Sequence, residues 1–155
     1  MIDGIQRVPL RVLSDDRGWF AELRRDSDLP RPMVQTNVAF SRAGVVRGLH
    51  FHERGQDDLF ACLLGTARIV VLNLDTGETF TEDIGDDNPV AIYVPGQHAH
   101  GYEALTDILL CYHVTAEFDP ADPDEHTVAW NDPRVADLWR TADPILSERD
   151  TVASL

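Results

Sequence analysis

Two histidines one residue apart are the first sign of chemistry in this sequence. His50 and His52 lie in the segment VVRGLHFHERGQDD, which covers residues 45–58. In a β-strand, residues two apart point to the same face, so both imidazoles can enter one site. An imidazole can bind a metal ion, or it can remove a proton from a substrate near neutral pH. The spacing alone leaves both kinds of chemistry open.

Two later residues can complete a set of metal ligands. Asp58 ends the same segment, and His100 follows Pro95 further along the chain. We expect both to come from strands that neighbour the strand of the histidine pair. Three imidazoles and one carboxylate suit Fe, Mn, Ni, Cu or Zn. The pattern resembles that of the metal-binding cupins, and one interpretation is therefore a first-row divalent metal. Its ligands would be His50, His52, Asp58 and His100.

Five further segments occur in a fixed order along nearly the whole chain. They are DDRGWFAEL (15–23), QTNVAFSRAGVVRGLHF (35–51), VPGQHAHGYEAL (94–105), WNDP (130–133) and LSERD (146–150). Together they resemble the dTDP-4-dehydrorhamnose 3,5-epimerase family, a non-metal branch of the cupin-like jelly rolls. The resemblance implies one cupin-like domain over residues 1–155. It also implies an isomerase that acts beside the ketone of a nucleotide-linked 4-keto-6-deoxy sugar, through an enolate and without a redox cofactor.

The same resemblance implies a role for each matching residue. His50 would be the general base, and Asp150 would fix its tautomer, which is chemically sensible for an imidazole beside a carboxylate. Tyr112 would be the acid that returns a proton from the opposite face. The substrate-binding residues would be Arg47, Gln35 and Asn37 at the diphosphate, His100 in the pocket wall, and Arg17, Phe20 and Glu22 at the nucleotide. The last three come from a partner subunit in the family, so a homodimer is expected.

The departures from the family affect the same site. His52 stands where the family has Gln, and Asp58 stands where it has a Lys that stabilises the enolate. A carboxylate at that position repels developing negative charge. A metal would supply a Lewis acid instead, but His50 cannot be both ligand and base, because both use one lone pair. Three interpretations stay open: an epimerase, a metal-dependent cupin enzyme acting on another small substrate, and a non-catalytic sugar-nucleotide-binding homologue.

The middle of the chain predicts the strands that position these residues. Apolar or alternating runs end at turn signals such as DTGE and Pro95-Gly96. The expected strands cover residues 59–64, 67–74, 79–84, 90–94 and 108–115. Strands at this spacing indicate an all-β fold, which we interpret as a cupin-type jelly-roll barrel with its ligand site in the mouth. Residues 11–26 are consistent with a strand and hairpin that feed the same sheets. A short C-terminal helix is expected over residues 131–140, where Asp132 can cap and Pro133 can open the first turn.

Composition narrows the choice of partners and compartment. The chain has 155 residues, with 13 basic and 27 acidic side chains and a net charge of −14. Such a surface repels phosphate backbones and anionic lipid, so neither nucleic acid nor a membrane is an expected partner. Cys62 and Cys111 lie in apolar runs, which predicts buried free thiols in a reducing cytoplasm. The N-terminus lacks the pattern of a signal peptide, and no apolar run approaches the roughly 20 residues of a membrane span.

Overall fold

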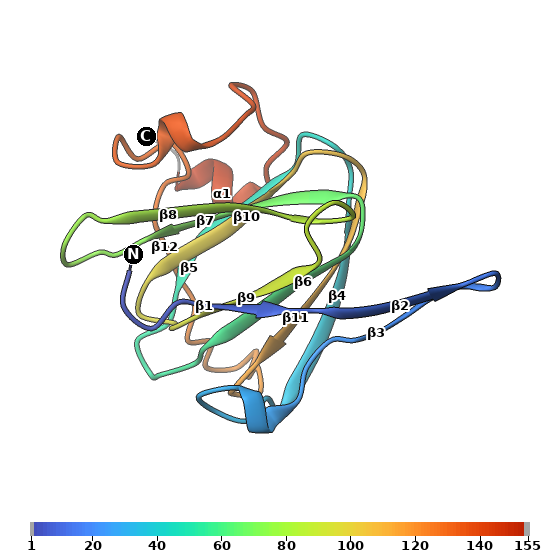
Figure 1. Ribbon diagram of the computed structural model, residues 1–155. Coiled ribbons are helices and arrows are strands. Elements are labelled where there is room, and N and C mark those ends of the chain that lie inside the picture. The colour runs from blue at the N-terminus through green and yellow to red at the C-terminus, as the bar shows by residue number, and fades with distance from the viewer. Residues whose placement is uncertain (1, 154–155) are drawn as a thin grey trace.

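Two antiparallel five-stranded sheets face each other in the computed structural model, which describes residues 2–153 (Figure 1). The first sheet has the order β1 (Gln6–Pro9), β9 (Val90–Val94), β6 (Asp58–Leu64), β11 (Ile108–Val114), β4 (Gln35–Ser41). The second has the order β12 (His126–Thr127), β5 (Val46–Phe51), β10 (Ala99–Ala104), β7 (Thr66–Leu72), β8 (Thr79–Gly85). This is the double sheet of a jelly roll. The fold class predicted from the sequence is confirmed.

Apolar side chains from both sheets form the main core. Phe60 and Ile92 of the first sheet pack with Ile69 and Val71 of the second. The outer face of the first sheet is covered by apolar residues of the N-terminal segment. The outer face of the second sheet is covered by the C-terminal segment. The central strands are therefore buried on both faces, and this explains why their sequences are apolar runs. All five strands expected from those runs are present, as β6, β7, β8, β9 and β11.

The N-terminal hairpin does not join either sheet, contrary to expectation. β2 (Arg11–Asp15) pairs with β3 (Gly18–Glu22) as a separate two-stranded unit that projects from the barrel (Figure 1). Apolar residues at its centre stay exposed, such as Trp19 at 54% and Phe20 at 63%. A single turn of 3-10 helix, η1 (Asp26–Asp28), follows. The alternation in the sequence predicted the hairpin correctly, but it does not reveal which surface the hairpin packs on.

The short C-terminal α-helix is present, but not at the expected place. It is α1 (Glu148–Val152), whereas residues 131–140 contain only the 3-10 turn η2 (Ala136–Leu138). Trp139 is buried against the second sheet, and the two backbone N–H groups that follow it donate to the carboxylate of Glu103 on β10. A carboxylate of the sheet therefore binds the backbone N–H groups at the end of this segment, where the chain leaves the 3-10 turn. Among residues 2–153, no helix is both long enough and apolar enough to cross a membrane.

Candidate active site

A cavity of about 770 Å³ lies between the two sheets and the C-terminal segment. This volume is in the range of small-molecule sites. All but three of the site residues expected from the sequence line it. They are Gln35 and Asn37 on β4, Arg47 and His50 on β5, His52 just after β5, Asp58 on β6, His100 on β10, Tyr112 on β11 and Asp150 in α1. Segments far apart in the sequence thus converge on one site.

Close contact between β5 and β10 sets the position of two of the histidines. A Cβ atom on Gly48 would lie 2.7 Å from the Cα of Gly101, and the φ of Gly48 is +130°. Only glycine allows this approach at low cost. The register pairs His50 on β5 with His100 on β10. Two glycines in the sequence therefore bring the two imidazoles to adjacent strands of one sheet.

His50 is hydrogen-bonded to Asp150, with 3.0 Å between Nε2 and Oδ1. Asp150 is only 2% exposed and lies in the first turn of α1, where its backbone N–H donates to the hydroxyl of the capping residue Ser147. Burial disfavours the Asp150 carboxylate, but the hydrogen bond and charge of His50 and the N–H of Gly48 together lower its pKa. In the tautomer that donates Nε2–H to Asp150, the Nδ1 lone pair of His50 is the one left to accept a proton.

Two charged residues that sequence reasoning missed surround the His50 ring. The guanidinium of Arg149 lies 2.7 Å from Nε2 and 3.4 Å from Nδ1. Glu125 lies 3.5 Å from Nδ1 and accepts a hydrogen bond of 2.6 Å from Arg149. Arg149 is next to Asp150 in the chain, and this adjacency was an available signal. Glu125 lies in the polar stretch DPADPDE, which carries no sequence signal for a site.

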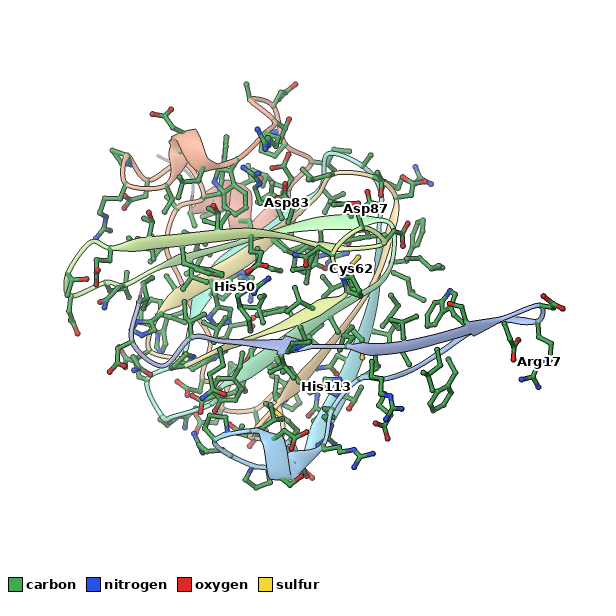
Figure 2. All side chains as sticks on the ribbon, in the orientation of Figure 1. Arg17, His50, Cys62, Asp83, Asp87 and His113 are labelled. Atoms are coloured by element: carbon green, nitrogen blue, oxygen red, sulfur yellow. The ribbon has the colours of Figure 1, made fainter. Side chains whose placement is uncertain are left out.

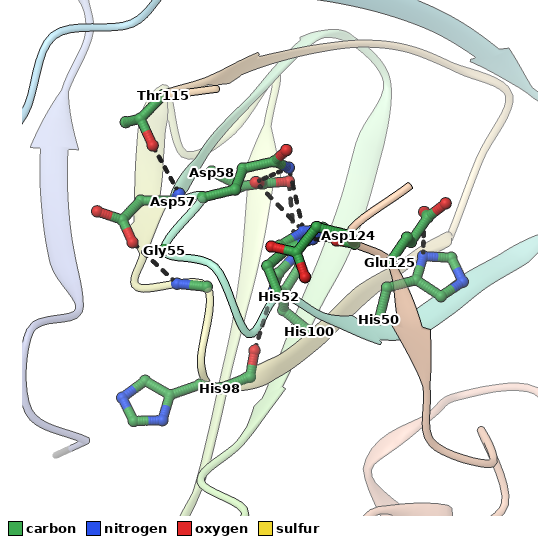
Figure 3. Close-up of polar contacts among 12 residues, drawn as sticks. His50, His52, Gly55, Asp57, Asp58, His98, His100, Thr115, Asp124 and Glu125 are labelled. Atoms are coloured by element: carbon green, nitrogen blue, oxygen red, sulfur yellow. Dashed lines mark hydrogen bonds and ion pairs between the residues drawn. The ribbon is translucent and has the colours of Figure 1, made fainter. Parts of the chain in front are cut away.

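The other two histidines form a separate cluster with Asp58. The His52 Nε2 and His100 Nε2 atoms lie 3.7 Å and 3.4 Å from the Asp58 carboxylate. All three side chains are buried, and their ligand atoms lie within 4.8 Å of one another. Figure 3 shows the cluster, with the His50 ring to one side against Glu125. The structure thus brings together three of the four residues in the expected metal-ligand set and places His50 with Asp150 instead.

Charge is shared unequally within this cluster. Burial disfavours the charged form of each member. The contact between Asp58 and His100 outweighs this cost, so the pKa of Asp58 is lowered and that of His100 is raised. Burial and the charge of His100 lower the pKa of His52. The contact with Asp58 therefore favours the charged form of His100, whereas burial favours the neutral form of His52.

Tyr112 lies on the first sheet, whereas His50 lies on the second. The Tyr112 ring stacks on Phe60 with 6.1 Å between centroids. Burial, followed by the nearby Tyr102 and Asp58, raises the pKa of Tyr112. Its phenol therefore stays protonated at neutral pH, as a proton donor requires.

The expected diphosphate-binding residues lie on the cavity wall. Gln35 and Asn37 are the partly buried members of an alternating strand, and the Gln35 amide donates to the Asn37 carbonyl at 2.9 Å. Arg47 is exposed and donates from Nε to the hydroxyl of Ser41 at 3.2 Å. The remaining donors of the Arg47 guanidinium give the cavity a group suited to a diphosphate.

The three residues expected at the nucleotide do not reach the cavity of their own chain. Arg17, Phe20 and Glu22 all lie on the projecting hairpin. Figure 2 shows Arg17 at its tip, far from His50. Arg17 is paired with Asp15, and Glu22 is paired with Arg25 at 2.7 Å. Within a single chain, Arg17 and Glu22 form local surface ion pairs, and Phe20 is exposed.

Comparisons with known proteins place this site in a family. The profile of the family described as dTDP-4-dehydrorhamnose 3,5-epimerase matches residues 1–155. The chain belongs to that family. The spore coat polysaccharide biosynthesis protein SpsL of Bacillus subtilis (strain 168) is 38% identical over 149 residues, which cover 91% of this chain and 98% of SpsL. The dTDP-4-dehydrorhamnose 3,5-epimerase of Pseudomonas aeruginosa is 33% identical over 153 residues, with 90% and 84% of the two chains covered.

A solved structure gives the same result. NovW, a 4-keto-6-deoxy sugar epimerase from the novobiocin cluster of Streptomyces spheroides, superposes with a TM-score of 0.88 at 32% identity, covering 99% of this chain and 83% of NovW. The family, the jelly-roll fold and the isomerase class predicted from the sequence are therefore confirmed. The comparisons support epimerisation of a 4-keto-6-deoxy nucleotide sugar as the reaction.

Proposed function

We propose that this epimerase inverts a carbon beside the ketone of a dTDP-linked 4-keto-6-deoxy sugar, with His50 as base and Tyr112 as acid. The observation that carries the assignment is the 3.0 Å hydrogen bond between His50 and the buried Asp150. It orients an imidazole toward the cavity with one lone pair left for a proton. The dTDP sugar is proposed because the family is described by that substrate.

The placement of the two groups fits an inversion. His50 lies on β5 of the second sheet and Tyr112 on β11 of the first, so they line opposite walls of the cavity. The His50 Nδ1 atom takes the proton as the C–H bond breaks, and the electron pair moves to the ketone oxygen to give an enolate. The phenol of Tyr112 then donates its proton to the opposite face of the same carbon. Solvent restores both residues, and no electrons leave the substrate, so no redox cofactor is needed.

A second copy of the chain would complete the nucleotide site. The hairpin exposes Trp19 and Phe20, and the outer face of the edge strand β4 exposes Val38 and Phe40 at about 60% each. Apolar surface of this extent is typical of an interface. A homodimer that covers it would also carry Arg17, Phe20 and Glu22 toward a neighbouring cavity, where they would meet the nucleotide. The free thiols Cys62 and Cys111 fit a reducing compartment, so we place the reaction in the cytoplasm.

The test is incubation with a dTDP-4-keto-6-deoxy sugar in D₂O, followed by NMR and mass spectrometry. We expect deuterium at a carbon beside the ketone, together with inverted configuration at that carbon. The positions labelled also show whether one carbon or two are inverted. Binding of the sugar nucleotide without any deuterium uptake would contradict the proposal and would favour a non-catalytic binding protein.

A further inference from the structure

We propose that His52, Asp58 and His100 form a divalent-metal site of two imidazoles and one carboxylate, distinct from the His50–Asp150 pair. This inference goes beyond the proposed function, which needs no metal. The first observation is convergence. The two Nε2 atoms lie 3.7 Å and 3.4 Å from the Asp58 oxygens, in a buried part of the cavity wall.

The backbone fixes which nitrogen each histidine turns toward the cluster. The Nδ1–H of His52 donates to the carbonyl of Asp124, and the Nδ1–H of His100 donates to the carbonyl of His98 at 2.8 Å. Each ring therefore turns its Nε2 atom toward Asp58, and loss of any proton on that atom frees the lone pair that a metal binds. A hydrogen bond from the second ring nitrogen is the usual support of a metal-binding histidine. Both imidazoles are pre-oriented as ligands through a single defined atom.

The spacing of the ligand atoms is close to what a metal needs. Nitrogen and oxygen ligands about 2.0–2.1 Å from a tetrahedral metal lie about 3.3 Å from one another. The separations to Asp58 are 3.4 Å and 3.7 Å, and no pair of ligand atoms exceeds 4.8 Å. Small side-chain shifts are enough to close the site. Three protein ligands would leave at least one further coordination position for water or a substrate, as in catalytic metal sites.

One neighbouring residue shows where the cation would lie. The amide nitrogen of Gln56 lies 2.9 Å from the Asp58 carboxylate and 3.1 Å from the His52 Nε2. The N–H groups of this amide therefore lie between two acceptor atoms, and a cation would be attracted to the same position. A bound metal would take the place of the Gln56 amide between these two ligand atoms.

His50 is excluded from the ligand set by its own hydrogen bond. Its Nε2 atom is engaged with Asp150, and its ring lies outside the group of converging atoms. The conflict between ligand and base that the sequence presents is thereby removed. A bound cation would supply a Lewis acid in the same cavity.

The test is metal binding by chelator-treated protein in separate dialyses against Zn²⁺, Fe²⁺, Mn²⁺ and Ni²⁺. We expect about one equivalent of at least one of these metals per chain. His52→Gln, Asp58→Asn and His100→Asn should each weaken binding by more than about 100-fold, since losing even a ligand's outer partner costs 10- to 100-fold. His50→Asn is the matched control and should bind as the parent does. Circular dichroism checks that each variant folds.

Three outcomes would overturn the proposal. In the first, the parent protein binds none of the four metals. In the second, the His50→Asn variant loses the metal. In the third, the variants at His52, Asp58 and His100 still bind it. X-ray absorption of the Zn²⁺-loaded parent needs no variant and must show two imidazole nitrogens on the metal. Deuterium exchange on the same samples separates the two proposals. Metal binding without exchange contradicts only the epimerase mechanism, and exchange without metal binding contradicts only the metal site.

Discussion

His50 and His52 are one residue apart, yet their rings are held in different ways. His50 is hydrogen-bonded through Nε2 to the carboxylate of Asp150 in the C-terminal helix, and its Nδ1 lies 3.5 Å from Glu125. His52 donates Nδ1–H to a backbone carbonyl at Asp124 and keeps Nε2 for a buried carboxylate. The difference does not come from the local sequence. It comes from two hydrogen-bond partners about 70 and 100 residues downstream, the Asp124 carbonyl for His52 and the Asp150 carboxylate for His50.

Burial separates the two groups further. The His50 side chain is 16% exposed, whereas those of His52 and Asp58 are 6% exposed and that of His100 is 4% exposed. A base must reach a substrate proton, so some access from the cavity is necessary. Ligands that hold a cation are better desolvated and fixed by outer hydrogen bonds. One cavity can therefore contain a proton-transfer pair and a cation site side by side.

The largest expected effect comes from His50→Asn, which removes the proton acceptor but keeps the polar side chain. Deuterium exchange into a dTDP-4-keto-6-deoxy sugar should fall by about 100- to 10,000-fold, the usual share of general base catalysis. Metal stoichiometry should not change. If the variant exchanges at nearly the parent rate, His50 is not the base and the division between the two histidines is lost.

Tyr112→Phe tests the acid on the opposite wall. Net inversion should fall by about 100-fold, because the proton donor on that face is missing. Deuterium exchange with retained configuration should persist, since His50 can remove a proton and return another to the same face. NMR of the product distinguishes the two outcomes. Equal loss of exchange and inversion would mean that Tyr112 is not confined to the second proton transfer.

Arg47→Ala tests whether the diphosphate lies on the β5 side of the cavity. Affinity for dTDP should fall by about 10- to 100-fold, as expected when a charge-assisted hydrogen bond loses its donor. Calorimetric titration measures this effect. Arg42→Ala is the control, because Arg42 is exposed and does not line the cavity. Equal dTDP affinity of the two variants would show that the diphosphate does not bind on the β5 side of the cavity.

The smallest expected effect concerns stability. The pKa of Asp150 is lowered in the folded protein. The ionised carboxylate therefore stabilises the fold fully above its pKa of about 3.9 in the unfolded chain. This stabilisation is lost as the pH falls through the lower pKa of the folded state. Asp150→Asn should therefore lower the free energy of unfolding by about 1–2 kcal/mol at pH 7. The gap to the parent should narrow at pH 3. Urea unfolding at both pH values measures it, and a constant gap would show that the charge of Asp150 contributes nothing.

The sequence predicts the sheets well because their pattern is local. Apolar runs between turn signals identified β6, β7, β8, β9 and β11, and packing between two covered sheets explains them. The two errors both concern where an element packs. Residues 131–140 have a helical pattern, but the carboxylate of Glu103 takes up backbone N–H groups there. The hairpin at residues 11–22 alternates like a core strand, although its apolar side chains remain exposed in one chain.

The site was predictable in its members but not in its grouping. The ordered family motifs pointed to His50, Asp150 and Tyr112 as site residues, and all three line the cavity. The spacing of His50 and His52 suggested one shared ligand set. The division between them depends on which distant carbonyl or carboxylate contacts each ring, and spacing does not encode that. Glu125 was missed for the same reason, since its contact with the His50 ring exists only in the folded chain, whereas Arg149 adjoins Asp150 in the sequence.

The division between the two histidine groups can be tested most directly by ¹⁵N NMR of the imidazole nitrogens in the parent protein, with and without Zn²⁺. We expect a proton on Nε2 of His50, and protons on Nδ1 of His52 and His100. Adding Zn²⁺ should shift the Nε2 signals of His52 and His100 and leave both signals of His50 unchanged. A Zn²⁺-induced shift at His50, or a His52 whose proton resides on Nε2, would contradict this division.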